Sequence, residues 1–503
     1  MTKSTQDKFW VYKAAAIAFF ILVNIINIGN PILEQHSFRQ TQTAISAFYL
    51  IQEGFTLNYI TPVLGLSYVI PFEFPFFHFI VAFIAKSTAI PLDVVGRLVS
   101  LIFAVGVLFL NESLLKCLGV ASRGRLFALL LAVFSPVFLF WSGTFMIEST
   151  ALFLSIASLL CAARYVKNQS GIDLFFWFGF VSLALLEKGT TALIPYLVGF
   201  AAILLTSIKI LKGPLGIHSV LKMIGLILLL TVPIALGYGW VFYTDILKSE
   251  NPIALSKLTS SALGAWNYGV PTQRFSYDFW IKDIFLRGVA PSALLGLGLI
   301  ALFYCIYSKS IKKADGYIAL GFLGLYLTPQ LIFTNLFIVH NYYHYAVIIY
   351  LCNAVAIAYD DIEVRAKKVA TYLLLATCVC SLVFFSKEYR NAKFKRIDKS
   401  HITIALANQI QFETLPEDVF VLLGNDWSAE VAYYAQRKSL TVPDWYLNKL
   451  NTDDWALYLN KSPKMIVICN NNDHRYDAFI NHMNGYGLNK EIQGCSLFKQ
   501  RAL

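Results

Sequence analysis

Three side chains that can do chemistry stand close together near the start of the chain, directly after an apolar run. Glu34, His36 and Arg39 bring a carboxylate, an imidazole and a guanidinium within six residues, just beyond the apolar segment 10–29. Such groups at a membrane boundary cost free energy unless they are solvated, paired or used. A carboxylate can take a proton from a hydroxyl, and a guanidinium can hold a phosphate. This cluster is therefore the first candidate site.

Charged, imidazole and aromatic side chains recur at the ends of other apolar runs. Carboxylates can accept a proton or orient a sugar hydroxyl, cationic groups can hold a leaving phosphate, and aromatic rings can stack on sugars. A lipid-phosphate substrate that enters from the bilayer needs all three kinds. We take Glu34 and Glu148 as the catalytic candidates. The candidates for binding substrate or phosphate are His36, Arg39, Glu73, Arg97, Lys188, Arg287, His340, Tyr342, Tyr343 and His344.

Several candidates also have a purely structural interpretation. Arg97 stands four residues after Asp93, a spacing at which two side chains can pair on a helix. Glu73 is flanked by two prolines that fix the local backbone, so it also fits a structural anchor. Lys188 fits a helix end, and Arg39 is long enough to reach lipid headgroups. The tyrosine and histidine candidates fit an aromatic belt at the membrane interface.

Composition determines the class of protein that must position these groups. The 503-residue chain is 57% hydrophobic and 14% charged, with a mean hydropathy of +0.60. A soluble protein carries roughly a quarter charged residues. The sequence therefore predicts an all-α membrane domain with many spans. The net charge of +11 fits basic cytoplasmic loops, and we expect no nucleic-acid partner.

Charge also predicts the topology. Apolar runs lie at about 10–29, 74–90, 97–115, 125–141, 149–165, 172–186, 190–208, 223–243, 288–307, 316–338, 345–359 and 369–385. The run 74–90 is short for a span and suits an interfacial helix. If it does not cross, every short cytoplasmic loop is basic, as the positive-inside rule expects. These loops carry Lys116, Arg123 and Arg125; Arg164 and Lys167; Lys209, Lys212 and Lys222; Lys309, Lys312 and Lys313; and Arg365, Lys367 and Lys368.

This arrangement predicts about eleven spans in a multi-pass protein of the cell (inner or plasma) membrane. Lys3, Lys8 and Lys13 before the first run indicate an uncleaved anchor with a cytoplasmic N-terminus. The regions outside the cytoplasm are then 30–95, 244–287 and the C-terminal tail, which follows residue 386.

The first outer loop and the tail have predicted structure of their own. In segment 40–52, apolar residues fall on one face, which suits a helix lying on the membrane surface. We divide the chain into a transmembrane catalytic domain, 1–386, and a soluble α/β domain, 387–503.

Within the tail, Val419–Leu423, Ser439–Val442 and Met465–Cys469 look like strands, with a helix between 428 and 436. It has no glycine-rich phosphate loop. Cys469 and Cys495 are free to pair if the tail lies outside, although spacing alone does not fix a disulfide.

Short motifs in the first 200 residues carry a family resemblance. They are His36-Ser-Phe-Arg-Gln-Thr-Gln-Thr-Ala44, Glu73-Phe-Pro75, Gly96-Arg97-Leu98, Ser135-Pro136, Phe145-Met-Ile-Glu148 and Glu187-Lys-Gly189. In their order along the chain they resemble the GT-C-fold glycosyltransferases, above all bacterial relatives of the protein O-mannosyltransferases and of the lipid A aminoarabinose transferases.

The resemblance implies an inverting transfer of a sugar from a polyprenyl-phosphate donor to a hydroxyl of a glycan, lipid or protein, outside the cytoplasm. The family's first-loop acidic residue corresponds to Glu34, which would deprotonate the acceptor. Its second-loop acidic residue corresponds to Glu148. Lys188 and Arg39 would suit the donor phosphate, whereas His36 receives no individual role.

The chain departs from the family at two places. Many relatives have an Asp, or an Asp-Glu pair, in the first loop, whereas here Gln35 follows Glu34. The aminoarabinose transferases have a Lys-Pro-Pro element where this chain has Glu73-Phe-Pro75, so their phosphate-binding lysine has no counterpart there. Metal use varies within the fold. No residue pattern in this chain requires a divalent cation, so the sequence leaves open whether one is used.

Two other classes of protein compete with a glycosyltransferase. A transporter of lipid-linked saccharides should have charges along a path through the membrane and often internal repeats. Here the charges gather at one predicted face, and no repeat is visible. An O-antigen-polymerase-like protein also has a large outer loop, but the acidic first loop and the α/β tail argue against it.

Overall fold

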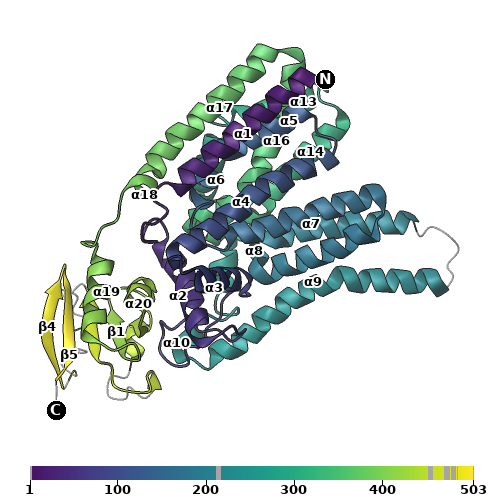
Figure 1. Ribbon diagram of the computed structural model, residues 1–503. Helices are drawn as coiled ribbons and strands as arrows, with labels where there is room; N and C mark the ends of the chain where they lie inside the picture. Colours follow the sequence, from purple (N-terminus) through teal and green to yellow (C-terminus); the bar gives the residue numbers. More distant parts are fainter. Residues whose placement is uncertain are drawn as a thin grey trace. The chain divides into compact units, whose positions relative to one another are not determined.

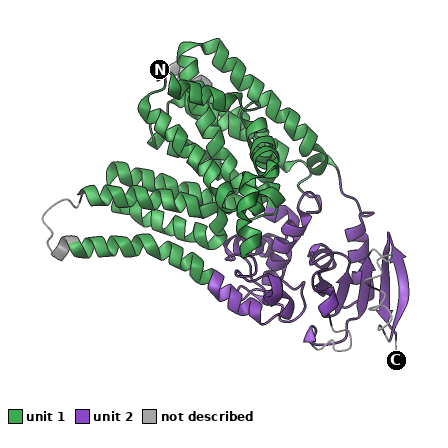
Figure 2. Cartoon of the chain, turned by 180° about the vertical axis from the view of Figure 1, so that it is seen from behind, with its two compact units in different colours: residues 1–28, 97–240, 264–395 green, residues 29–96, 241–263, 396–503 purple. Residues whose placement is uncertain are grey.

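The computed structural model describes residues 3–210, 217–450, 457–469, 476, 483 and 485–501, and the chain forms two compact units (Figure 2). Unit 1 comprises residues 1–28, 97–240 and 264–395, and unit 2 comprises 29–96, 241–263 and 396–503. Helices α4 (Leu92–Cys117) and α9 (Ile217–Ser249) continue from one unit into the other along the chain.

Unit 1 is built of helices, which Figure 1 labels. Besides α4 and α9 they are α1 (Lys3–Ile25), α5 (Ser122–Phe134), α6 (Pro136–Trp141), α7 (Glu148–Asn168), α8 (Gly171–Ile210), α11 (Gly264–Tyr268), η1 (Pro271–Phe275), η2 (Asp278–Val289), α12 (Ala290–Ser292), α13 (Leu297–Tyr307), α14 (Lys313–Ile332), α15 (Thr334–Val339), η3 (Asn341–His344), α16 (Tyr345–Arg365), α17 (Lys367–Glu388) and α18 (Arg390–Phe394). Helix α16 lies at the centre of the core of unit 1. Its residues from Tyr345 to Tyr359 are all buried, and it packs against α5, α13, α14 and α17.

Several described helices are long and apolar enough to cross a membrane. Five pass this test over Leu92–Cys117, Glu148–Asn168, Gly171–Lys209, Val220–Ser249 and Lys367–Glu388. A sixth possibility is the pair Asp278–Ser292 and Leu297–Tyr307, which is bent by 80°. Breaks shorten other helices: α5 ends before Pro136, whose ring disfavours helical backbone in the preceding residue. A count of eleven spans stays a prediction.

Helix α8 contains the boundary between two predicted spans. Its two halves meet at Lys188, which has extended backbone angles (φ −158°, ψ 93°). The apolar runs 172–186 and 190–208 lie on either side of this break. A polar residue therefore stands where the helix is interrupted, as the two separate runs predict.

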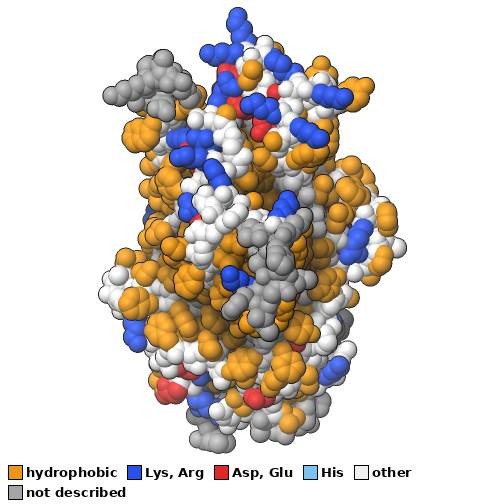
Figure 3. Space-filling model, turned by 90° about the vertical axis from the view of Figure 1, so that its right-hand side faces the viewer, with side chains coloured by type: hydrophobic (Ala, Val, Ile, Leu, Met, Phe, Trp, Pro, Cys, Tyr) orange, Lys and Arg blue, Asp and Glu red, His pale blue; other side chains and the backbone are white. Residues whose placement is uncertain are grey.

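Polar contacts within unit 1 join several of the segments that are predicted to face the cytoplasm. Arg123 pairs with Asp360 at 2.6 Å, and the hydroxyl of Ser310 donates to Asp361. Glu112 pairs with Lys13 near the N-terminus. Lys and Arg side chains accordingly gather at the upper end of Figure 3, the end at which Figure 1 marks the N-terminus. Lys212, which was assigned to one of these loops, lies outside the described residues.

Unit 2 contains a five-stranded sheet with the order β2-β1-β3-β5-β4. The strands are β1 (Val419–Leu423), β2 (Lys438–Val442), β3 (Met465–Cys469), β4 (Tyr486–Ile492) and β5 (Cys495–Gln500), and the helices are α2 (Ser37–Glu53), α3 (Phe76–Thr88), α10 (Pro252–Lys257), α19 (Ile402–Glu413), α20 (Glu430–Ala435) and the short η4 (Leu447–Lys449). Strands β2, β1 and β3 are parallel, whereas β5 and β4 are antiparallel. The three strands predicted from the sequence are confirmed, as is the helix between 428 and 436.

The first outer loop adds to this sheet. Leu64 forms an antiparallel bridge with Leu440 of β2, and the amide of Thr441 donates to the carbonyl of Val63 at 2.7 Å. The buried side chain of Asn251 donates to the carbonyl of Leu66 at 2.7 Å and also caps α10. All three regions predicted to lie outside the cytoplasm thus contribute to unit 2, although residues 264–287 belong to unit 1.

Helix α2 forms where the sequence predicts a helix in the first outer loop. Its polar residues Gln40, Thr41, Gln42 and Thr43 are all buried. Helices α3 and α20 pack against α2. The position of α2 on the membrane surface stays a prediction.

The tail contains the disulfide that the sequence left open. Cys469 and Cys495 are bonded across the neighbouring strands β3 and β5, with their Cα atoms 4.0 Å apart. The six other cysteines are free.

Candidate functional site

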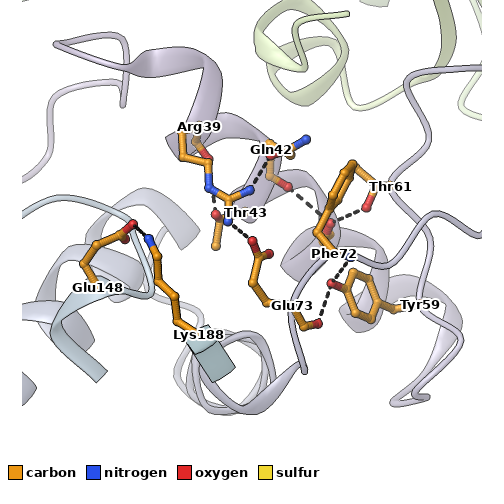
Figure 4. A network of polar contacts seen from close by, with 10 residues as sticks. Arg39, Gln42, Thr43, Tyr59, Thr61, Phe72, Glu73, Glu148 and Lys188 are labelled. Atoms are coloured by element: carbon orange, nitrogen blue, oxygen red, sulfur yellow. Dashed lines mark hydrogen bonds and ion pairs between the residues drawn. The ribbon is translucent and has the colours of Figure 1, made fainter. Parts of the chain in front are cut away.

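The first candidate cluster lies in unit 2, between the start of α2 and the segment before α3. Figure 4 shows Arg39 turned toward both Gln42 and Glu73. Its guanidinium donates to the Gln42 amide oxygen at 2.5 Å and forms an ion pair with the Glu73 carboxylate. Both charged side chains are mostly buried, at 16% and 18% exposure. The Arg39 charge is therefore neutralised within the loop.

The backbone of Glu73 is fixed by a buried tyrosine. The hydroxyl of Tyr59 donates to the carbonyl of Glu73 at 2.8 Å and accepts from the amide of Phe72 at 2.9 Å. Pro71 and Pro75 further restrict this segment. The ring of Tyr59 stacks on His78, whose pKa is lowered to about 3, first by burial and then by Arg39. His78 is therefore neutral and is no source of positive charge.

Glu34 and His36 lie in the turn that starts α2. His36 adopts left-handed backbone angles (φ 52°, ψ 39°), and its carbonyl accepts from the amides of Arg39 and Gln40. The carbonyl of Glu34 accepts from the amide of Ser37. His36 thus shapes the turn through its backbone. Glu34, His36, Arg39 and Glu73 all belong to unit 2, as their proximity in the first loop predicts.

The tail packs directly on this cluster. Trp427, four residues after β1, contacts the ring of Phe38 edge-on at 4.9 Å and stacks on Phe72 at 5.7 Å. These two residues immediately precede Arg39 and Glu73. The hydroxyl of Ser37 also donates to Glu430 of α20 at 2.6 Å. The tail therefore supports the first-loop cluster within unit 2.

The second cluster lies in unit 1 and joins the start of α7 to the break in α8. Lys188 forms an ion pair with Glu148, as Figure 4 shows. Both side chains are buried, with 8% and 2% exposure. Glu148 is the first residue of α7, where the helix dipole favours a negative charge. Its second oxygen, Oε2, has no hydrogen-bond partner within the described part of the chain.

Aromatic rings cover the Lys188 ammonium. Its Nζ lies 4.4 Å from the ring centre of Tyr343 and 5.2 Å from that of Tyr342, distances at which a cation is attracted to a ring face. Tyr342 in turn stacks on His340 and contacts Trp141 edge-on. The structure thus brings together Glu148, Lys188 and the tyrosines that the sequence selected on separate helices.

A buried carboxylate that sequence reasoning missed holds the turn bearing these tyrosines. Asp283, in the π-helical segment η2, is contacted at 2.9 Å by His344 Nε2 and at 3.1 Å by Arg287. Arg287 also donates to the carbonyls of Phe337 and Ile338, near the end of α15. His344 and Arg287 are therefore anchors of η3 and α15. An acidic residue four positions before Arg287, a spacing at which two side chains can pair on a helix, was the available signal.

Arg97 likewise has structural partners. It is buried and donates to the carbonyls of Asn27 and Ile28, just beyond the end of α1, at 3.4 and 3.0 Å. These contacts make Arg97 a connection between α4 and α1 within unit 1. They give Arg97 a structural role, and its binding of phosphate stays a prediction.

Comparison with known proteins identifies the fold. No family model and no curated protein matches the sequence. The crystal structure of ArnT from Cupriavidus metallidurans bound to undecaprenyl phosphate aligns with a TM-score of 0.63 and 12% identity over 97% of both chains. The cryo-EM structure of the arabinofuranosyltransferase AftD from Mycobacteria aligns with a TM-score of 0.53 and 12% identity over 98% of this chain and 40% of that one. The chain has the GT-C fold of a membrane protein, as its motifs predicted.

Proposed function

We propose that this GT-C-fold chain is a glycosyltransferase that uses a polyprenyl-phosphate-linked sugar as donor and a hydroxyl of a glycan, lipid or protein as acceptor. The observation that carries the proposal is the alignment over 97% of the chain with a structure whose ligand is undecaprenyl phosphate. The buried ion pair between Lys188 and Glu148 supports it, since such pairs inside membrane domains mark functional sites.

The proposed reaction balances without an added oxidant or reductant. The acceptor oxygen forms a bond to the anomeric carbon while its proton passes to Glu34. The bond from that carbon to the phosphate oxygen breaks, and polyprenyl phosphate leaves with the electron pair. Attack from the side opposite the phosphate inverts the anomeric configuration. Lys188, held by Glu148 and two tyrosines, is proposed to stabilise the leaving phosphate.

A reconstituted assay tests this function. We expect the purified chain in proteoliposomes to release polyprenyl phosphate from polyprenyl-phosphate-linked hexoses or pentoses only when an acceptor hydroxyl is supplied, because transfer couples bond cleavage to acceptor attack. Chromatography of the lipid products measures the release. If the donor instead changes leaflet with its sugar–phosphate bond intact, the chain is a transporter.

We also propose that unit 2 lies outside the cytoplasm. The disulfide between Cys469 and Cys495 supports this side, because disulfides persist in oxidising compartments. The basic short loops support it as well, since such loops stay in the cytoplasm and the predicted topology then puts 30–95, 244–287 and the tail on the other side.

Thiol labelling in intact cells tests the orientation. A cysteine replacing Phe412, which is 83% exposed in α19, should react with a membrane-impermeant reagent without lysis. The matched control is a cysteine replacing the exposed Lys309 in a predicted cytoplasmic loop, which should react only after lysis. The reverse pattern would overturn the orientation.

A further inference from the structure

A lysine that the sequence did not single out is buried in unit 2. Lys248, in the last turn of α9, is only 6% exposed. Its Nζ lies 5.2 Å from the ring centre of Phe72 and 3.5 Å from the hydroxyl of Thr244. No carboxylate among the described residues pairs with it. Asp245, three residues earlier, instead accepts from the amide of Ser260 at 3.0 Å.

Three other cationic candidates for phosphate binding differ from Lys248 in this respect. Arg39 is paired with Glu73, Lys188 with Glu148 and Arg287 with Asp283. Each of these cations already has a protein carboxylate, whereas the Lys248 ammonium has an aromatic ring and a hydroxyl. A buried charge without a counter-ion is costly, and such groups in membrane proteins usually serve a ligand. An anion is the ligand that would offset this charge.

The position of Lys248 specifies what kind of anion fits. The apolar span Val220–Ser249 ends at this turn, so Lys248 stands at a membrane boundary, where lipid phosphates lie. It also contacts Phe72, the neighbour of Glu73, and Phe72 stacks on Trp427 of the tail. Because Arg39 and Glu73 neutralise each other, Lys248 adds to the first-loop cluster a cation that forms no ion pair with a described carboxylate.

We propose that Lys248 binds the phosphate of an anionic lipid, and specifically that of the polyprenyl-phosphate donor. This assignment rests on the proposed function for the identity of the lipid, but the site itself rests on the burial of Lys248 and on its lack of a carboxylate partner. Phe72 holds the ammonium in place through its ring face. The charged hydrogen bond to phosphate then forms when the lipid binds.

Binding of polyprenyl phosphate to the full-length protein in nanodiscs tests the proposal. We expect Lys248→Gln to raise the Kd by about tenfold or more, as the loss of a hydrogen bond to a charged group predicts. Lys248→Arg should retain most of the affinity, because it keeps the positive charge. The thermal unfolding midpoint of apo Lys248→Gln should equal or exceed that of the wild type, since the variant removes a buried charge that forms no ion pair.

Lys257 provides a matched control. It lies nine residues further along in the same unit, with its ammonium 5.3 Å from the ring centre of Trp445, but it is exposed to solvent. Lys257→Gln should bind polyprenyl phosphate like the wild type. An equal loss of affinity in both variants would show a general effect of charge and overturn the specific site.

The remaining outcomes separate this site from the proposed function. If the wild type and Lys248→Gln bind the lipid equally, the Lys248 site is wrong while the donor assignment stands. If the wild type binds inorganic phosphate but not polyprenyl phosphate, and Lys248→Gln binds neither, Lys248 forms an anion site but the assignment of a polyprenyl-phosphate donor is wrong. If the wild type binds neither probe, both proposals are wrong. A lower unfolding midpoint together with lost binding in both the Gln and Arg variants would show a structural role instead.

Discussion

Replacing Glu34 with Gln is expected to lower sugar transfer by about 10²- to 10⁴-fold, the usual range for loss of a general base. Glutamine has nearly the same shape but cannot accept the acceptor's proton. The turn that starts α2 uses the backbone carbonyl of residue 34, which Gln also supplies. The fold and the binding of donor should therefore survive, and the loss should appear in kcat measured at saturating donor.

Two further variants sharpen this measurement. Glu34→Asp keeps a carboxylate and should recover part of the activity. Glu53→Gln is the matched control, because Glu53 ends the same helix α2, is partly exposed and pairs with Lys438 at 2.7 Å. It should transfer sugar like the wild type. Near wild-type turnover in Glu34→Gln would show that Glu34 is not the general base, and Glu73 would be the next carboxylate to test.

Local patterns predicted the parts of this molecule that depend on neighbours in the sequence. The runs of branched apolar residues in the tail located β1 and β3, because a buried strand needs only a short stretch of such residues. The break at Lys188 was predictable for a similar reason, since a charge between two apolar runs marks a helix end. The order of short motifs along the chain predicted a GT-C fold, and the comparison with solved structures confirms this fold.

Pairings between distant residues were not predictable in this way. Lys188 and Glu148 are 40 residues apart, and spacing alone does not select the carboxylate that an ammonium meets. Sequence analysis therefore selected Glu148 as a catalytic candidate and Lys188 as a phosphate-binding candidate, but it did not predict their ion pair. Lys248 was overlooked because a lysine in the last turn of an apolar helix is ordinary. Only its burial and its lack of a carboxylate partner single it out.

The second large effect concerns the ion pair in unit 1. Lys188→Met should destabilise the protein by about 3–5 kcal/mol, because it leaves the buried Glu148 carboxylate without its counter-ion. Glu148→Gln should also destabilise the protein, because it leaves the buried Lys188 ammonium without its counter-ion. The double variant should recover most of the stability, since it leaves neither charge unpaired. Thermal unfolding in one detergent measures all four proteins, and the exposed pair of Lys282 with Asp278 supplies a control whose removal should change little.

If the ion pair serves the reaction, the double variant should regain thermal stability but not sugar transfer. A pair that only holds α7 against α8 would be dispensable once its charges are removed together, so a double variant with restored stability would also regain transfer. If Lys188 stabilises the leaving phosphate, the same variant stays inactive although it folds. The two interpretations predict opposite results for one protein, so recovered transfer would limit Lys188 to packing and leave Lys248 as the phosphate ligand.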